Sequence, residues 1–319
     1  MFQANWTSVT GFFFLGFSHY PNAEAIIFVL CLLMYLIALL GNTILISITI
    51  WDSHLHTPMY FFLSNLSFLD IFYTSSAFTP MLENFVSGEN TISFSRCASQ
   101  MYISLAMGST ECVLLSMMAY DRYVAICNPL RYPLIMNKKV CAQIAAGSWV
   151  TGCLTALVET VPVLQLPLCG NSIINHFACE ILAVLKMACV DTSTVQLIML
   201  VISVLLLPVP ILLICISYAF ILSNILRISS REGRSKAFST CAAHLTVVVL
   251  FYGTALSMYL KPSAVNSQEI DKFMALVYGG LTPMLNPIIY SLRNKDVKAA
   301  VKKQLIRNLF NTILISITK

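Results

Sequence analysis

Charged side chains are scarce in this chain. Only 10% of its 319 residues are Asp, Glu, Lys or Arg, whereas 58% are hydrophobic, and the mean hydropathy is +0.79. One soluble core cannot bury so much apolar surface, so the composition excludes an ordinary soluble protein and predicts that lipid is the solvent. The net charge of +5 does not indicate nucleic-acid binding, because the basic residues lie between hydrophobic runs.

Several functional classes lack the residues that they need. No lysine occurs from Phe273 to Leu292, so a retinal-binding photoreceptor would have no Schiff-base residue in the last apolar run. Neither two similar halves nor a charged pore lining is present, which argues against a transporter or a channel. No enzyme-like constellation occurs beyond a weak cluster of His176, Cys179 and Glu180, so we expect the protein not to be an enzyme.

The first segment, residues 1 to 24, has neither Lys nor Arg and does not resemble a cleavable signal peptide. We interpret it as a short polar extracellular segment, followed by an apolar run from Ala25 that acts as an uncleaved signal anchor. Asn5-Trp6-Thr7 is an N-glycosylation acceptor if this end lies outside the cytosol.

Apolar runs predict seven membrane-spanning helices, and hence an all-α membrane protein whose bundle covers residues 25 to 291. The runs cover roughly residues 25 to 50, 57 to 80, 97 to 122, 141 to 163, 195 to 226, 237 to 260 and 272 to 291. An odd number of spans puts the two ends of the chain on opposite sides. The loops on the side of the carboxyl terminus hold Arg122, Arg131, Lys138, Lys139, Arg227, Arg231, Arg234 and Lys236, whereas the other side keeps Arg96, Lys186, Lys261 and Lys272. This asymmetry predicts a multi-pass protein with its amino terminus outside and its carboxyl terminus in the cytosol.

Residues 292 to 319 follow the last span. Val297, Val301, Leu305 and Leu309 recur at every fourth position among lysines. This pattern predicts a short basic amphipathic helix on the anionic inner leaflet, so membrane lipid is an expected partner. Residues 311 to 318 repeat residues 42 to 49 letter for letter, and we have no physical account of the repeat.

Two carboxylates lie deep in the predicted spans. Asp70 and Glu111 are each roughly 16 to 20 Å from the cytosolic end of their helices. Two neighbouring buried carboxylates cannot both stay ionised cheaply, so either one of them holds a proton or a cation such as sodium lies between them. For two other polar residues within the spans, Asn42 and His244, we favour packing roles.

Most of the eleven cysteines lie in or beside spans, where a free thiol behaves as a small apolar group. Four fall on the predicted outer side: Cys97, Cys169, Cys179 and Cys189. An even set in this compartment implies disulfides, with three possible connectivities. The His176, Cys179 and Glu180 cluster could alternatively hold a metal, but the disulfide interpretation already uses Cys179.

Charge reappears where helices leave the apolar region. Asp121-Arg122-Tyr123 lies at the inner end of the third span, which Pro129 stops. Pro208 and Pro210 predict a kink in the fifth span.

Together, these features resemble the rhodopsin-like G-protein-coupled receptors: the triplet at 121 to 123, Asn286-Pro287-x-x-Tyr290, Asp70, Gly41-Asn42, Trp149 and Cys97. Four longer strings resemble the olfactory receptor family in its tetrapod-type branch, and the similarity covers nearly the whole chain. These strings are PMYFFLSNLSFLD (58 to 70), MAYDRYVAICNPLRYP (118 to 133), KAFSTCAAHL (236 to 245) and PMLNPIIYSLRNKDVK (283 to 298).

The resemblance implies residue roles. Asp121 would hold Arg122 until activation releases Arg122 to a stimulatory G protein. Tyr123, Tyr218, His244, Asn286, Pro287 and Tyr290 would belong to the same coupling and switch region, and Asp70 with Glu111 would be the central ion or proton site. The family's disulfides would pair Cys97 with Cys179 and Cys169 with Cys189.

A ligand site is predicted from one face of the third span, where Ser104, Leu105, Gly108, Ser109 and Cys112 recur at one- to four-residue steps. This face is small, mostly apolar and has no carboxylate in its outer half, which disfavours a salt bridge to a biogenic amine. By family analogy the cavity is closed by Ile202, Ser203, Leu206, Tyr252, Ala255, Leu256, Tyr259, Leu276 and Gly279.

The expected function is that of an odorant receptor in the plasma membrane. It would bind a small, volatile, largely apolar ligand and raise cyclic AMP through a stimulatory G protein. A trafficking chaperone is a possible further partner. The alternative is a non-olfactory chemosensory receptor for a small metabolite.

Overall fold

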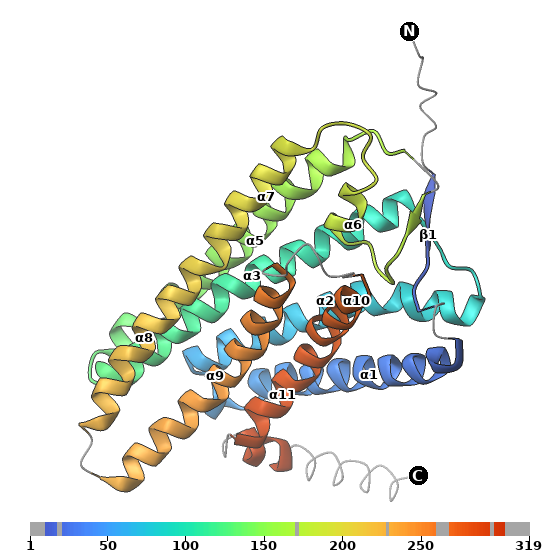
Figure 1. The fold of residues 1–319 in the computed structure, drawn as a ribbon. Coiled ribbons are helices and arrows are strands. Elements are labelled where there is room, and N and C mark those ends of the chain that lie inside the picture. Colours follow the sequence, from blue (N-terminus) through green and yellow to red (C-terminus); the bar gives the residue numbers. More distant parts are fainter. Residues whose placement is uncertain are drawn as a thin grey trace, which may run out of the picture.

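The computed structural model describes residues 10–17, 21–169, 172–227, 230–259, 268–293 and 297–303. These residues form a bundle of long helices capped by a small sheet (Figure 1). The main helices are α1 (Pro21–Trp51), α2 (Pro58–Ser87), α3 (Phe94–Cys127), α5 (Lys138–Leu164), α7 (Ser193–Leu206), α8 (Pro208–Leu226), α9 (Arg231–Tyr259), α10 (Gln268–Leu276) and α11 (Thr282–Arg293). Shorter helices are η1 (Ser53–Leu55), α4 (Tyr132–Ile135), α6 (Ile181–Leu185) and η2 (Val277–Leu281), the last of π type.

Helices are expected here because lipid cannot hydrogen-bond to exposed backbone groups. Among the described residues, six helical stretches are long and apolar enough to cross a bilayer: Ala23–Trp51, Phe94–Cys127, Lys138–Leu164, Ser193–Leu226, Arg231–Ser257 and Ile270–Ser291. The seventh helix of the bundle, α2, has 30 residues but carries many hydroxyl side chains and Asp70. It packs between α1 and α3, so the predicted seven-helix fold is confirmed.

The third span, α3, lies at the centre of the bundle and contacts α2, α5, α7, α8 and α9 (Figure 1). Its first turn is capped by Ser93, whose side chain accepts a hydrogen bond from the backbone N–H of Arg96. The predicted fifth span is interrupted at Leu207, directly before Pro208, and continues as α8. The seventh span likewise changes helix type at η2.

One end of the bundle, which we call the disulfide end, carries a three-stranded sheet. Strand β1 (Gly11–Phe14) lies between β2 (Thr91–Ser93), to which it is antiparallel, and β3 (Ile173–Ile174), to which it is parallel. Phe12, Phe14 and Phe17 are buried beneath or beside this sheet. The interpretation of residues 1 to 24 as simply polar is therefore wrong for the described part, because alternate aromatic residues of β1 pack inward.

The opposite end, which we call the Arg122 end, carries the described part of the predicted amphipathic helix. Residues 297–303 are helical, with Val297 and Ala300 buried against the bundle and three lysines exposed. The Nζ atom of Lys303 lies 3.6 Å from Oδ2 of Asp52, beside η1. Leu305, Leu309 and the repeated segment at 311 to 318 lie outside the described residues.

Candidate functional site

A cavity of about 190 Å³ lies inside the bundle near the disulfide end. Its volume is below the roughly 300 to 1,000 Å³ of pockets for drug-sized ligands, so it suits a small molecule. Most of the exposed lining is apolar. Its walls come from α2, α3, α5, α7, α9, α10 and η2, and the loop between α5 and α7 covers it.

Many residues of the sequence-predicted ligand set line this cavity. They are Ser104, Leu105, Gly108, Ser109 and Cys112 from α3, Ile202, Ser203 and Leu206 from α7, and Ala255 from α9. The third-span face predicted from helical spacing therefore borders one cavity.

Four predicted residues do not line the cavity in the described structure. The hydroxyl group of Tyr252 donates a hydrogen bond of 2.9 Å to the carbonyl oxygen of Cys112, so this side chain joins α9 to α3. A Cβ atom on Gly279 would lie 3.0 Å from the ring of Tyr73, because the π-type turn presses this backbone onto α2. Leu256 is half-buried and does not line the cavity. Leu276 packs against a hydrophobic cluster beside α1. The side chain of Tyr259 lies outside the described residues.

The loop that covers the cavity is held by two disulfides. Cys97 pairs with Cys179 and Cys169 with Cys189, with Cα–Cα distances of 5.4 and 5.5 Å. These are the pairs that the resemblance implied. The loop is not structureless, because it contains β3 and α6.

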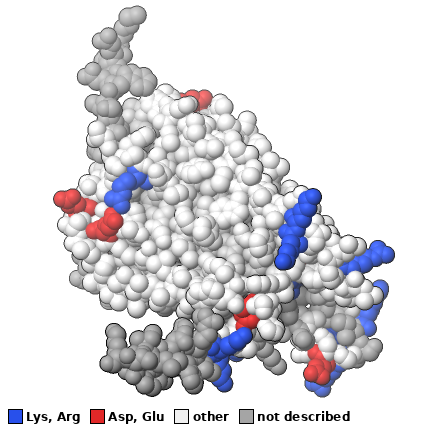
Figure 2. Space-filling view, turned by 180° about the vertical axis from the view of Figure 1, so that it is seen from behind, with Lys and Arg blue, Asp and Glu red and all other residues white. Residues whose placement is uncertain are grey.

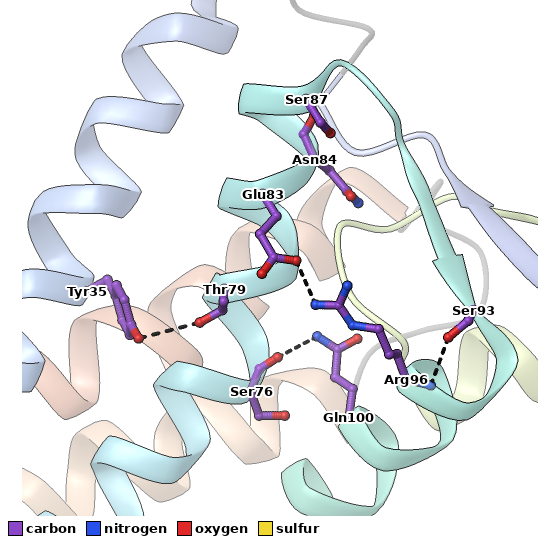
Figure 3. A network of polar contacts seen from close by, with 9 residues as sticks. All are labelled: Tyr35, Ser76, Thr79, Glu83, Asn84, Ser87, Ser93, Arg96 and Gln100. Carbon is purple, nitrogen blue, oxygen red and sulfur yellow. Dashed lines mark hydrogen bonds and ion pairs between the residues drawn. The ribbon is translucent and has the colours of Figure 1, made fainter.

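Gln100 fixes the same loop through both ends of its amide. Its Oε1 accepts a hydrogen bond of 2.8 Å from the backbone N–H of Cys179, and its Nε2 donates one of 2.8 Å to the carbonyl oxygen of Ser76. Close by, Arg96 and Glu83 form an ion pair of 2.6 Å between α3 and α2 (Figure 3). The roof of the cavity is thereby tied to two helices that form its walls.

His176 and Glu180 bring ionisable groups to the roof. Nδ1 of His176 accepts a hydrogen bond from the backbone N–H of Ala178, and Nε2 lies 3.4 Å from Oε1 of Glu180. Burial, with a smaller effect of nearby Lys272, lowers the pKa of His176 to about 4. Burial, with a smaller effect of Asp271, raises the pKa of Glu180 to about 7.

The alternative metal site at His176, Cys179 and Glu180 has lost one ligand, because Cys179 forms a disulfide with Cys97. No metal-binding cluster of three His, Cys, Asp or Glu residues occurs in the part of the chain that the structure describes.

The segment directly after β1, residues 15 to 17, braces this roof. The backbone N–H groups of Leu15 and Gly16 donate hydrogen bonds to the carbonyl oxygens of Ile174 and His176. The ring of Phe17 stacks on that of Phe177, with 5.6 Å between their centroids, and Phe177 lines the cavity. Asn5 lies outside the described residues.

Sequence reasoning missed several lining residues. The roof contributes His176, Phe177, Glu180 and Ile181, and the bundle contributes Tyr73, Phe251, Tyr278 and Glu159. For Glu159 a signal was present, because it is the only charged residue between 141 and 163, and an ionisable residue inside a span is a functional candidate by default. For the roof residues, the implied Cys97–Cys179 disulfide placed their loop at the outer end of the third span, but no signal showed which of its side chains line the cavity.

The centre of the bundle holds the predicted carboxylate pair. Nδ2 of Asn286 donates a hydrogen bond of 2.9 Å to Oδ2 of Asp70, which links α11 to α2. Oε1 of Glu111 and Oδ1 of Asn286 are buried without a hydrogen-bond partner among the described residues. Nearby, Nδ2 of Asn42 donates to the carbonyl oxygen of Pro283 at 3.0 Å, a packing role that ties α1 to α11.

At the Arg122 end, the guanidinium group of Arg122 is bonded to the carboxylate of Asp121. Nε of Arg122 donates to Oδ2 at 3.0 Å, and Nη2 closely approaches the same oxygen. Oδ1 of Asp121 accepts a hydrogen bond of 2.7 Å from the hydroxyl group of Tyr132 in α4. This tyrosine was not among the predicted site residues.

The other predicted switch residues lie around this pair. The hydroxyl group of Tyr218 and Nδ1 of His244 are 2.8 Å apart, which joins α8 to α9. The ring of Tyr123 packs 5.8 Å from that of Phe220. Pro287 lies within α11, and the buried hydroxyl group of Tyr290 has no hydrogen-bond partner among the described residues.

The chain was compared with known proteins. The family model described as "Olfactory receptor" matches residues 30–308. Olfactory receptor 13F1 of Homo sapiens is 81% identical over 319 residues, covering 100% of both chains. Olfactory receptor 2K2 of Homo sapiens is 67% identical over 301 residues, which cover 94% of this chain and 95% of the relative. The helical bundle, its cavity and these similarities lead to one assignment: the chain belongs to the olfactory receptor family.

Proposed function

We propose that this chain is an odorant receptor that binds a small, mostly apolar molecule in the cavity beneath the disulfide-linked loop. The observation that carries the proposal is the cavity of about 190 Å³, lined mostly by apolar groups together with a few hydroxyl and ionisable side chains. As a member of its family, the protein is a G-protein-coupled signalling receptor and not an enzyme.

The bundle is a multi-pass membrane protein, and we place its disulfide end outside the cell. Disulfides persist in oxidising compartments, which supports this orientation. Figure 2 shows a broad surface without charge, while Lys and Arg side chains gather mainly toward the Arg122 end. Basic residues favour the cytosolic side, so the plasma membrane would surround the uncharged band and the lysines after residue 297 would face anionic lipid. In this orientation Asn5 is available for glycosylation.

The Arg122 end would couple to a stimulatory G protein. The bonds from Arg122 and Tyr132 to Asp121 stabilise the arrangement described here. The contact between Tyr218 and His244 joins the two helices next to this arginine. Ligand binding that favours a different position of α9 would release Arg122 toward the G protein, and cyclic AMP would rise.

The centre between Asp70 and Glu111 would hold a proton or a sodium ion. Oxygen ligands suit a hard cation, and the unpartnered oxygens of Glu111 and Asn286 together with Asp70 supply them. A bound cation would offset the repulsion between the two carboxylates.

The test is a cyclic AMP assay in cells that express the full chain, with and without a trafficking chaperone, challenged with a panel of volatile compounds. Surface protein is measured in parallel. We expect a ligand-dependent rise that Arg122→Ala abolishes while surface expression persists. A normal response of the Arg122→Ala variant would contradict the coupling mechanism, and silence of a surface-expressed receptor across the panel would contradict the odorant assignment.

A further inference from the structure

Glu159 places a carboxyl group in the lining of the cavity. It belongs to α5, five residues before the helix ends at Leu164, and its residue is 6% exposed. Within the described part of the chain, no hydrogen bond or ion pair reaches this carboxyl group. Burying a carboxyl group without a partner costs free energy, which suggests that its partner is something the protein binds.

The packing of α5 against α3 explains why Glu159 faces inward. At Gly152 the two helices approach so closely that a Cβ atom would lie 2.6 Å from the carbonyl oxygen of Ala106. Gly152, Ala156 and Glu159 recur at helical spacing and are all buried. Glu159 thus continues the contact stripe about 10 Å further toward the disulfide end, where Met101 and Leu105 of α3 line the same cavity.

The charges around the cavity favour a donor rather than an acceptor. Its carboxyl and imidazole side chains, among the described lining residues, are those of Glu159, Glu180 and His176, and no Lys or Arg side chain lines it. Burial lowers the pKa of His176 to about 4, so the imidazole is neutral at pH 7 and does not offset the carboxyl groups. An anionic ligand would find no cationic side chain in the lining to pair with, whereas a protonated amine would form a charge-assisted hydrogen bond to a carboxylate.

We propose that the cavity selects small aliphatic amines, with Glu159 accepting the hydrogen bond from the ligand's ammonium group and the apolar walls holding its carbon chain. This ligand class rests on the proposed receptor function. It differs from the expectation drawn from the third span, whose outer half has no carboxylate that could pair with an amine. The carboxylate comes from α5 instead. Alcohols of the same length, which donate without charge, are weaker ligands, and carboxylic acids are excluded.

The test is a cyclic AMP concentration series at pH 7.4 with four probes of equal chain length: pentylamine, 1-pentanol, 2-pentanone and pentanoic acid. We expect pentylamine to be the most potent and pentanoic acid to be inactive. Glu159→Gln should weaken the pentylamine response on the order of 10- to 100-fold, the value of one hydrogen bond to a charged group, and should change the 2-pentanone response far less. Glu159→Asp should retain part of the amine response.

Two controls separate the possible failures. Glu89→Gln alters an exposed carboxylate and should leave all four responses unchanged, and surface labelling of each variant removes effects of folding. Pentanoic acid acting more strongly than pentylamine, equal loss of all responses in Glu159→Gln, or no pentylamine response from surface-expressed receptor each overturns the amine assignment. If 2-pentanone activates the receptor and Glu159→Gln does not change that response, the proposed odorant-receptor function is still supported. Silence across a broad odorant panel would contradict the odorant-receptor function itself.

Discussion

The hydroxyl group of Tyr252 in α9 donates a hydrogen bond of 2.9 Å to the carbonyl oxygen of Cys112 in α3, and Cys112 lines the cavity. One side chain thus joins the wall of the ligand site to the helix that also carries His244. A ligand that presses on Cys112 would strain this bond directly.

Tyr252→Phe removes the bond and keeps the ring. We expect ligand-free cyclic AMP to rise about two- to tenfold, because losing a net 0.5–1.5 kcal/mol destabilises the arrangement in which Arg122 is bound to Asp121. The measurement is basal cyclic AMP per receptor at the surface. Unchanged basal signalling would show that the bond does not differ between the two states.

Asp121→Asn should also raise basal signalling, because the neutral amide holds Arg122 less strongly than the carboxylate does. Tyr132→Phe removes only one hydrogen bond to Asp121 and should have a smaller effect in the same direction. The two variants are compared by basal cyclic AMP, with Arg122→Ala as the silent reference. A larger effect of Tyr132→Phe would contradict this ranking.

Gln100→Ala should destabilise the roof of the cavity. The substitution leaves the N–H of Cys179 and the carbonyl oxygen of Ser76 without their side-chain partner, at a cost of about 1–3 kcal/mol for each buried group. We expect a lower thermal midpoint of the detergent-solubilised receptor and weaker ligand response. Gln143→Ala, at an exposed position of α5, serves as control and should change neither.

The two disulfides should differ in their effect on stability. Cys97 and Cys179 are 82 residues apart in sequence, whereas Cys169 and Cys189 are 20 apart. The longer loop restricts the unfolded chain more, by about 1.2 kcal/mol in a chain-entropy estimate. Cys97→Ser with Cys179→Ser should therefore lower surface expression more than Cys169→Ser with Cys189→Ser does. Equal losses would indicate that loop length does not set the difference.

The sequence itself determined the class of fold. Runs of apolar residues long enough to cross a bilayer exist in the chain before it folds, so hydropathy predicted a seven-span fold. Six helical stretches of the described residues are apolar enough to cross a bilayer on their own, and α2 completes the bundle by packing between α1 and α3. Local spacing also placed Ser104, Leu105, Gly108, Ser109 and Cys112 on one face of α3, because helical geometry fixes which neighbours share a face.

Only the tertiary structure decided what those faces meet. Asn286 reaches Asp70 across 216 residues of chain, and nothing local in the sequence specifies that contact. Tyr252 turned toward the backbone of α3 rather than into the cavity, and Gly279 lies against Tyr73, because rotation and close approach of helices are set by packing. The sequence showed Glu159 as the only charged residue of its span. Which way its side chain faces was decided by the close packing of α5 against α3 at Gly152. Hydropathy is a property of each segment, whereas a binding site is a property of several segments brought together.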